Sequence, residues 1–458
     1  MNYEFGNEDL PEDFIALMRS HLGDEQAESL FRGLQEPPSV AVRFNPRKIQ
    51  HLALNREVLS DPVPWCPDAY YLSERKAFTF DPLFHAGAYY VQDASSMYLA
   101  EILRKYFSSL TSHFLPLIIA LDLCAAPGGK STLLASLLPE GSTLISNEPI
   151  RKRAQVLAEN MQKWGSPTAD GRPGVAVRSV VTQNYPDEFG HFRDTFDLIL
   201  ADVPCSGEGM FRKDPVAIRE WSLDNVRQCA QRQRDILRAI VPTLRPGGLL
   251  VYSTCTFNRF EDEEQVQWLV SEYGLQLLEE RHFFPGRDRG EGLYIAALRR
   301  TEGTEQTETT ERDTHPFCSD ELRKRLQSSP SAPFTLHPSS LKTLNVIADS
   351  LSYNSQFSIL NPQSPNSQSS ILNSQSPNSQ SSILNPQLEL SYPQAIAYLR
   401  REALHVAAPR GIVCVTYRGL PLGLAKSVGT RLNNLYPQEW RIRTTYNPTE
   451  PLPDFFLS

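Results

Sequence analysis

Two cysteines in similar surroundings carry the most chemical information in this chain. Cys205 lies in Asp202-Val-Pro-Cys-Ser-Gly and Cys255 in Tyr252-Ser-Thr-Cys-Thr, each at the end of a short apolar run. A cysteine thiolate is a strong nucleophile, and two thiols can divide a covalent reaction into an attack and a release step. One such cysteine alone would more simply be a buried core thiol. The repeated context favours a chemical role for the pair.

Upstream of both cysteines lies a segment that is typical of a cofactor-binding loop. Residues 121–132, Leu-Asp-Leu-Cys-Ala-Ala-Pro-Gly-Gly-Lys-Ser-Thr, end a predicted strand in small residues and then open a helix. Backbone N–H groups in such a turn can approach a ligand closely. The phosphate-loop pattern GxxxxGK[ST] is absent, because position 124 is cysteine. Glu148 ends the next apolar run, where a carboxylate can accept both hydroxyls of a ribose. Together with the cysteines, this loop predicts a methyltransferase with a covalent step.

The elements around these residues predict an α/β domain. Helix-like stretches at 150–164 and 223–244 alternate with apolar runs, and Pro246-Gly-Gly is expected to end the second helix. Such alternation predicts a doubly wound parallel sheet. The expected strands are 117–123, 143–146, 175–181, 196–201 and 249–253.

The rest of the 458 residues predicts further modules. The N-terminal part has a helical pattern over 13–31, an extended segment at 40–48 and an aromatic strand before a helix at Ser95. Near the other end of the sequence, residues 411–423 predict a strand, a turn and a second strand. A polar segment that repeats every twelve residues from Asn354 is too rich in proline to form a core. The predicted parts are an N-terminal module (1–108), a catalytic domain (109–300), an acidic, threonine-rich linker (301–315), the start of a C-terminal region (316–350), the repeat insertion (351–387) and a β-rich C-terminal domain (388–458).

Composition limits the classes of partner. The chain has 45 basic and 53 acidic residues, so a nucleic-acid site must be a local basic patch. Residues 388–458 carry eight basic and five acidic side chains, a net charge of +3, and Arg441 and Arg443 alternate along an expected strand. The chain has seven cysteines without CxxC spacing, which predicts reduced thiols in a cytoplasmic protein and no metal site. It has no long apolar stretch, so no membrane segment is expected.

Three motifs resemble those of the RsmB/RsmF (NOL/NOP/Sun) family of RNA cytosine-5 methyltransferases. They are Leu121-Asp-Leu-Cys-Ala-Ala-Pro-Gly-Gly-Lys, Ala201-Asp-Val-Pro-Cys-Ser-Gly-Glu-Gly and Tyr252-Ser-Thr-Cys-Thr. The segments at 42–46, 86–97 and 431–443 are most similar to the RsmF-type enzymes that act on 16S ribosomal RNA. The resemblance covers residues 10–300 and 388–445. It implies a class I S-adenosylmethionine-dependent methyltransferase fold, which is Rossmann-like with a seven-stranded sheet, an N-terminal α+β RNA-positioning module and a PUA-like RNA-binding domain.

The resemblance also implies roles for particular residues. Cys255 would be the nucleophile, Cys205 would assist release, and Asn184 is the candidate for the adenine contact, where relatives usually have aspartate. Lys130 would orient the cytosine or Asp202. The residues that would hold S-adenosylmethionine are Cys124, Ala125, Ala126, Pro127, Gly128, Gly129, Lys130, Glu148, Asn184 and Asp202.

These residues suit a defined reaction. Carbon 5 of cytosine is a weak nucleophile, and a thiolate that adds to carbon 6 makes carbon 5 enamine-like. Cys255 is assigned this attack and Cys205 the release step, while Asp202 would stabilise charge on the ring nitrogen. We expect a monomer that acts on ribosomal RNA or the small ribosomal subunit. A transfer RNA cytosine-5 methyltransferase, a DNA cytosine-5 methyltransferase and a catalytically idle RNA-binding assembly factor remain alternatives.

Overall fold

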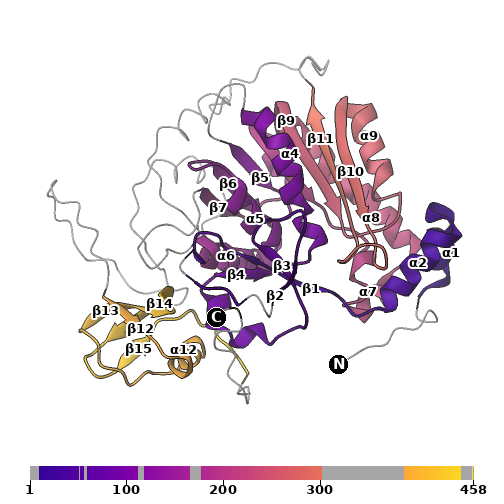
Figure 1. Ribbon diagram of the computed structural model, residues 1–458. Helices are drawn as coiled ribbons and strands as arrows, with labels where there is room; N and C mark the ends of the chain where they lie inside the picture. The colour runs from indigo at the N-terminus through magenta and orange to yellow at the C-terminus, as the bar shows by residue number, and fades with distance from the viewer. Residues whose placement is uncertain are drawn as a thin grey trace.

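The computed structural model describes residues 10–50, 52–55, 59–111, 118–165, 177–301, 386–444 and 456. The expected linker, the 316–350 segment and the repeat insertion lie outside the described residues, except for one residue at the start of the linker and two at the end of the repeat. Three β-sheets organise the described chain, one of seven strands and two of four (Figure 1).

The central sheet has the strand order β10-β11-β9-β8-β5-β6-β7. The run from β9 to β7 is parallel, whereas β11 is antiparallel to both β9 and β10. The predicted seven-stranded, Rossmann-like sheet is therefore confirmed. Its strands are β5 (Ile119–Asp122), β6 (Thr143–Asn147), β7 (Arg178–Thr182), β8 (Phe196–Asp202), β9 (Leu244–Thr254), β10 (Leu275–Phe283) and β11 (Leu293–Arg300).

Helices cover both faces of this sheet, which explains the continuous apolar runs in the sequence. Ala120 and Leu198 point toward the face covered by α4, α5 and α6, while their neighbours Ile119 and Ile199 belong to the core under α8 and α9. Side chains alternate between the faces of a strand, so a strand buried on both sides must be apolar throughout. The helices are α4 (Leu99–Thr111), α5 (Gly129–Leu137), α6 (Arg151–Gly165), α8 (Leu223–Ile240) and α9 (Glu263–Tyr273).

The predicted end of the 223–244 helix is wrong. Helix α8 ends at Ile240, a 3₁₀ turn covers Val241–Thr243, and β9 begins at Leu244, so the Pro-Gly-Gly segment lies inside the strand. Pro242 has no N–H group with which to continue the α-helical hydrogen bonds, and the Thr243 hydroxyl donates to the Ile240 carbonyl at 2.6 Å. Pro242 is thus the residue of this segment that signals the end of the helix.

The N-terminal module combines three helices with a small antiparallel sheet. The helical stretch expected at 13–31 is divided at Gly23, whose φ of 79° is in the region that favours glycine. The sheet has the order β2-β3-β1-β4. Its elements are α1 (Glu12–Leu22), α2 (Asp24–Gln35), β1 (Val40–Phe44), β2 (Leu59–Pro62), β3 (Ala69–Leu72), α3 (Pro82–His85) and β4 (Tyr89–Val91).

The C-terminal domain packs on this module. The predicted strand–turn–strand is confirmed as β13 and β14, whereas the strand expected through Arg441 and Arg443 is not formed. One apolar core joins Phe44 of β1 to Val415 of β13, and the Tyr392 hydroxyl donates to the Phe80 carbonyl at 3.0 Å. Figure 1 shows the domain beside the N-terminal module, away from β9 and β11. Its elements are β12 (Gln387–Glu389), α12 (Tyr392–Leu399), β13 (Gly411–Tyr417), β14 (Leu420–Ser427) and β15 (Leu432–Asn434).

No helix among the described residues is long and apolar enough to cross a bilayer.

Candidate active site

The predicted cofactor loop joins the end of β5 to the start of α5. Gly128 caps α5 with a φ of 115°, a backbone conformation that residues with a Cβ rarely adopt. Neighbouring segments hold the loop: Ala125 N–H donates to the Asn147 carbonyl at 2.8 Å, and the Asn160 amide donates to the Pro127 carbonyl at 2.8 Å. The backbone of residues 124–130 is thus fixed at the carboxyl end of the parallel strands, where ligands bind in open α/β sheets.

Two buried carboxylates lie at this edge. Asp122 ends β5 and accepts from the Ser131 hydroxyl at 2.6 Å through Oδ2, while its Oδ1 has no hydrogen-bond partner. Glu148 follows β6 and accepts from the Ile150 N–H at 2.9 Å through Oε1, and its Oε2 also lacks a hydrogen bond, although the Arg153 guanidinium lies 3.3 Å away. Burial, together with the nearby Asp202 and Glu148 charges, raises the pKa of Asp122 to about 7, against the Ser131 hydrogen bond.

These residues fit S-adenosylmethionine. Buried acceptors without partners are uncommon in folded proteins, and a bound ribose with its hydroxyls and a positively charged cofactor would satisfy them. The loop of small residues leaves room for close backbone approach. Asp122, which was not among the predicted cofactor residues, lies at the same edge as that set. Its position at the end of the first parallel strand was the available signal.

Asn184 is brought to the same edge, just beyond β7. It is buried, its backbone N–H donates to Asn147 Oδ1 at 2.9 Å, and its side-chain amide donates to Glu188 at 3.3 Å. Asn147 also donates to the Leu123 carbonyl at 3.0 Å, so one buried amide connects the ends of β5, β6 and β7. Asn147 was missed, because nothing in its local sequence distinguishes it.

The two cysteines meet at the ends of the neighbouring parallel strands β8 and β9. Their Sγ atoms are 3.1 Å apart, both thiols are free, and both residues are partly buried. The hydrogen bond with Cys255 and burial raise the pKa of Cys205 well above its ordinary value, and the negative charge of a Cys255 thiolate adds to this effect. The 3.1 Å contact lets a Cys205 thiol donate a hydrogen bond to a thiolate on Cys255 and stabilise it.

A lysine and an acid lie beside the cysteines. Lys130 Nζ is 2.8 Å from Asp202 Oδ1, and the Ser253 hydroxyl donates to the same oxygen at 2.7 Å. Burial alone would lower the pKa of Lys130, but the Asp202 carboxylate outweighs it and the net shift is upward. The Asp202 side chain stays 32% exposed, so it is accessible to a substrate. The structure thus gathers the four predicted catalytic side chains, Lys130, Asp202, Cys205 and Cys255.

Two buried acids support the cysteine loops from behind. Glu261 accepts from the backbone N–H of Ser206 at 3.0 Å, and Glu208 accepts from the N–H of Phe257 at 2.6 Å. The side chain of Asn258 donates to both carboxylates at 2.9 Å. Burial raises the pKa of Glu261, and it raises that of Glu208 to about 7. These contacts fix the residues that follow each cysteine, and sequence reasoning missed them.

Arg43 connects the N-terminal module to the cofactor loop. It lies on β1, is 2% exposed, and donates to Thr132 Oγ1 at 2.6 Å and to the Gly129 carbonyl at 3.2 Å in the first turn of α5. Gln92 accepts from its Nε at 2.9 Å, and the guanidinium lies 4.5 Å from the Trp164 ring centroid. The module therefore contributes directly to the position of α5.

Comparison with known proteins gives consistent matches along the chain. Residues 118–299 match the family model described as 16S rRNA methyltransferase RsmB/F. Residues 10–94 match the N-terminal domain of 16S rRNA methyltransferase RsmF, and residues 385–442 match the methyltransferase RsmF PUA domain.

Curated proteins and solved structures agree with these matches. The ribosomal RNA small subunit methyltransferase F of Cronobacter sakazakii is 30% identical over 95% of this chain and 97% of its own length. The enzyme of the same name from Vibrio cholerae is 32% identical over 67% of each chain. The structure of NSun6 from Pyrococcus horikoshii with SFG shares the fold, with a TM-score of 0.52 and 20% identity over 65% of this chain and all of that one. The chain belongs to the RsmB/F family of S-adenosylmethionine-dependent methyltransferases.

Proposed function

We propose that this protein methylates carbon 5 of a cytosine in 16S ribosomal RNA through a covalent bond between Cys255 and the base. The observation that carries the proposal is the contact of the Cys205 and Cys255 sulfur atoms at 3.1 Å, beside the Lys130–Asp202 pair. The names of the curated relatives support ribosomal RNA of the small subunit as the substrate.

Attack by Cys255 is the first step. Its thiolate adds to carbon 6 of the cytosine, and the electron pair moves to carbon 5 and toward the ring nitrogen. Asp202, held by Lys130 and Ser253, would hydrogen-bond the edge of the ring where this charge develops. When bound, S-adenosylmethionine supplies the methyl group that carbon 5 takes up. The loop at 124–130, Asp122, Glu148 and Asn184 would hold the cofactor.

Release depends on Cys205. The first cause of its raised pKa is the hydrogen bond with Cys255, and a Cys255 sulfur bonded to carbon 6 carries no negative charge. The pKa of Cys205 would then fall, so that it can lose its proton to solvent and accept the proton on carbon 5. The electron pair of that C–H bond re-forms the ring double bond, and the bond between carbon 6 and sulfur breaks to return the Cys255 thiolate. This order gives each thiol one task.

The retained side chains weigh against the alternatives. An idle assembly factor would not need the Cys205–Cys255 contact and the Lys130–Asp202 ion pair at the same edge of the sheet. A transfer RNA enzyme would share the same chemistry, so only the substrate separates it from the proposal. The target base must also leave its stack before a thiol can reach its face, and RNA loops offer this at low cost.

Bisulfite sequencing of ribosomal and transfer RNA tests the proposal. Cells with and without the gene are compared, together with cells rescued by the unchanged gene or by Cys255→Ala. We expect one small-subunit cytosine to lose methylation, to regain it with the unchanged gene, and to stay unmethylated with Cys255→Ala. A site lost only from transfer RNA would favour that substrate instead. The absence of any lost site in either RNA would reject the proposed cytosine methylation.

A further inference from the structure

Three side chains of metal-binding types meet beside the loop that carries Cys255. Asp262 and Glu263 begin α9, as its N-cap and its first residue, and His282 lies on β10. Each can offer one ligand atom, and these three atoms lie within 4.8 Å of one another. The expected absence of a metal site rests on cysteine spacing and does not cover these residue types. We call the three side chains the acid–histidine cluster.

Each side chain of the cluster keeps one atom without a hydrogen bond. Asp262 Oδ2, Glu263 Oε2 and His282 Nδ1 are buried atoms that have no hydrogen-bond partner. Asp262 is fully buried, and its Oδ2 lies 3.9 Å from His282 Nδ1, which is too far for a hydrogen bond. The Asp262 side chain also makes no capping hydrogen bond to α9, the usual reason for an acid at this position. A ligand bound between the two atoms would satisfy both.

The charge around the acid–histidine cluster favours a cation. In the part of the chain that the structure describes, neither of its carboxylates forms an ion pair with a lysine or an arginine. Arg259, whose charge reaches Glu263, donates to the His21 carbonyl at 2.8 Å instead. Burial raises the pKa of Asp262 well above its ordinary value, and the nearby charge of Glu261 adds to this effect. A divalent cation would compensate this concentration of negative charge.

The donor atoms suit a divalent transition metal such as zinc. Zinc accepts imidazole nitrogen and carboxylate oxygen, with bonds of about 2.0–2.2 Å. An ion with such bonds to Asp262 Oδ2 and His282 Nδ1 fits between atoms that are 3.9 Å apart. His282 Nε2 lies 3.1 Å from Glu263 Oε1, a contact that holds the ring while Nδ1 binds the ion. Magnesium and calcium prefer oxygen ligands, so the imidazole disfavours them.

The position of Asp262 connects this cluster to the loop of the proposed nucleophile. The hydroxyl groups of Thr254 and Thr256 donate to Asp262 Oδ1 at 2.5 and 3.0 Å. Asp262 thus holds both neighbours of Cys255 with one oxygen and directs the other toward His282. An ion on Oδ2 would join the Cys255 loop to β10.

We propose that Asp262, Glu263 and His282 bind one divalent transition-metal ion, for which zinc is the probe, and that this ion ties the Cys255 loop to β10. The side chains of Glu263 and His282 are 29% and 16% exposed, so an ion can enter from solvent. The cluster shares no side chain with the cofactor loop or the proposed catalytic set. The role of the ion is therefore structural, and its binding does not depend on which RNA is methylated.

The test measures zinc binding by the full-length protein after treatment with a chelator. Two thiols in contact can also bind zinc, so all proteins carry Cys205→Ser and Cys255→Ser. The parent with these two changes is compared with His282→Gln and Asp262→Asn. The matched control is His405→Gln, at an exposed histidine outside the cluster. Zinc is titrated against a coloured chelator, bound metal is counted by mass spectrometry, and thermal unfolding is followed with zinc or magnesium.

We expect the parent to bind one zinc ion and the control to bind it equally well. His282→Gln and Asp262→Asn should each weaken zinc binding at least about tenfold. Zinc at about 100 times its dissociation constant should shift the folding equilibrium of the parent about 100-fold toward the folded state. This shift should be lost in His282→Gln, and magnesium should not produce it in any of the proteins.

Two results would overturn the proposal. A parent protein that binds no stoichiometric zinc would leave water as the bridge between the two unpartnered atoms. Equal zinc affinity in the parent, His282→Gln and Asp262→Asn would place the ion elsewhere as an adventitious ion only. Glu263→Gln, at a partly exposed side chain, keeps the comparison decisive if Asp262→Asn does not fold. It should also weaken zinc binding, and unchanged affinity in both Glu263→Gln and His282→Gln would count against the site.

Discussion

Replacing Arg43 with methionine tests how the N-terminal module supports the cofactor loop. Each charged hydrogen bond of Arg43 contributes about 1.5–3 kcal/mol, and its contact with Trp164 about 0.5–2 kcal/mol. With bonds to Gln92, Thr132 and Gly129, the gross contribution is roughly 5–11 kcal/mol. The cost of burying the charge offsets part of this contribution, because burial lowers the pKa of Arg43 to about 10 and leaves its Nη1 without a hydrogen-bond partner. We expect a net loss of about 3 kcal/mol of unfolding free energy.

Urea unfolding and calorimetric titration with S-adenosylmethionine measure this change. The cofactor should bind about tenfold more weakly to Arg43→Met, because the first turn of α5 loses two of its hydrogen bonds. Arg43→Lys, which keeps the charge but not the fork of donors, should lie between the two proteins and remains measurable if Arg43→Met fails to fold. Arg104→Met, at a side chain 71% exposed, serves as the control and should change neither quantity. The reasoning is refuted if Arg43→Met unfolds and binds the cofactor like the parent protein.

Three further changes test the cofactor edge and its supports. Gly128→Ala places a Cβ 3.3 Å from Leu157 Cδ1 at a φ of 115°, so it should cost about 1–2 kcal/mol and weaken cofactor binding in titration. The pKa of Asp122 is raised to about 7, so ionising its carboxyl group costs more free energy in the folded protein than in the unfolded chain. The unfolding free energy of the cofactor-free protein should therefore fall as pH rises from about 4 to 7. Affinity for the cationic cofactor should conversely rise about tenfold from about pH 6 to 8, and Asp122→Asn should abolish both trends. Glu208→Gln replaces a carboxylate that accepts from three donors with an amide, so urea unfolding should show a loss of about 1–3 kcal/mol of unfolding free energy. An unchanged urea midpoint would contradict the supporting role of Glu208.

The central sheet was predictable because its strands are buried on both faces. Each appears as a short apolar run, and the chemistry-bearing residues follow these runs directly. Asp122, Asp202 and Cys255 therefore reach one edge of the sheet by topology alone. The Pro-Gly-Gly segment misplaces the predicted end of α8, because Pro242 already interrupts the helical hydrogen bonds.

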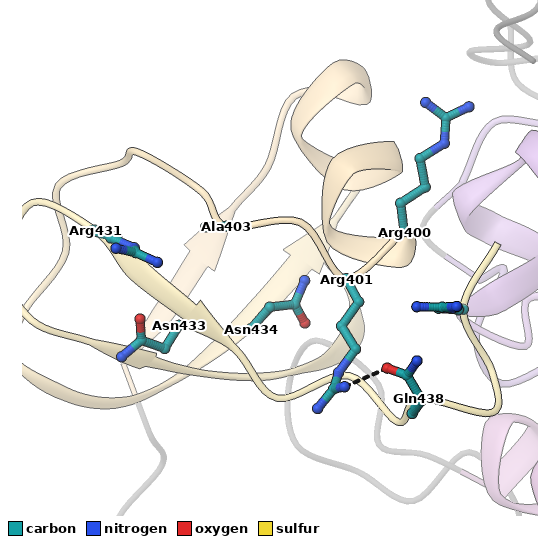
Figure 2. Close-up of a pocket in the computed structure, with 8 residues that line it drawn as sticks. Arg400, Arg401, Ala403, Arg431, Asn433, Asn434 and Gln438 are labelled. Atoms are coloured by element: carbon teal, nitrogen blue, oxygen red, sulfur yellow. Dashed lines mark hydrogen bonds between the residues drawn. The ribbon is translucent and has the colours of Figure 1, made fainter. Parts of the chain in front are cut away.

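The supporting side chains could not be predicted from local sequence. Arg43 reaches Thr132 across 89 residues, and Glu208 reaches Phe257 across 49. Such contacts depend on how separate modules pack, and no periodic pattern signals them. The sequence predicted a basic C-terminal domain, but only folding brings Arg400, Arg431 and Arg441 together around one pocket of that domain (Figure 2).

Trapping of a protein–RNA adduct tests the central claim most directly. Cys205→Ala, Cys255→Ala and the double variant are incubated with small-subunit ribosomal RNA and S-adenosylmethionine and then separated under denaturing conditions. We predict that Cys205→Ala accumulates an adduct that survives denaturation, because carbon 6 stays bonded to Cys255, and that neither protein lacking Cys255 forms one. Normal methylation by both single variants without any adduct would contradict the covalent role assigned to the cysteine pair.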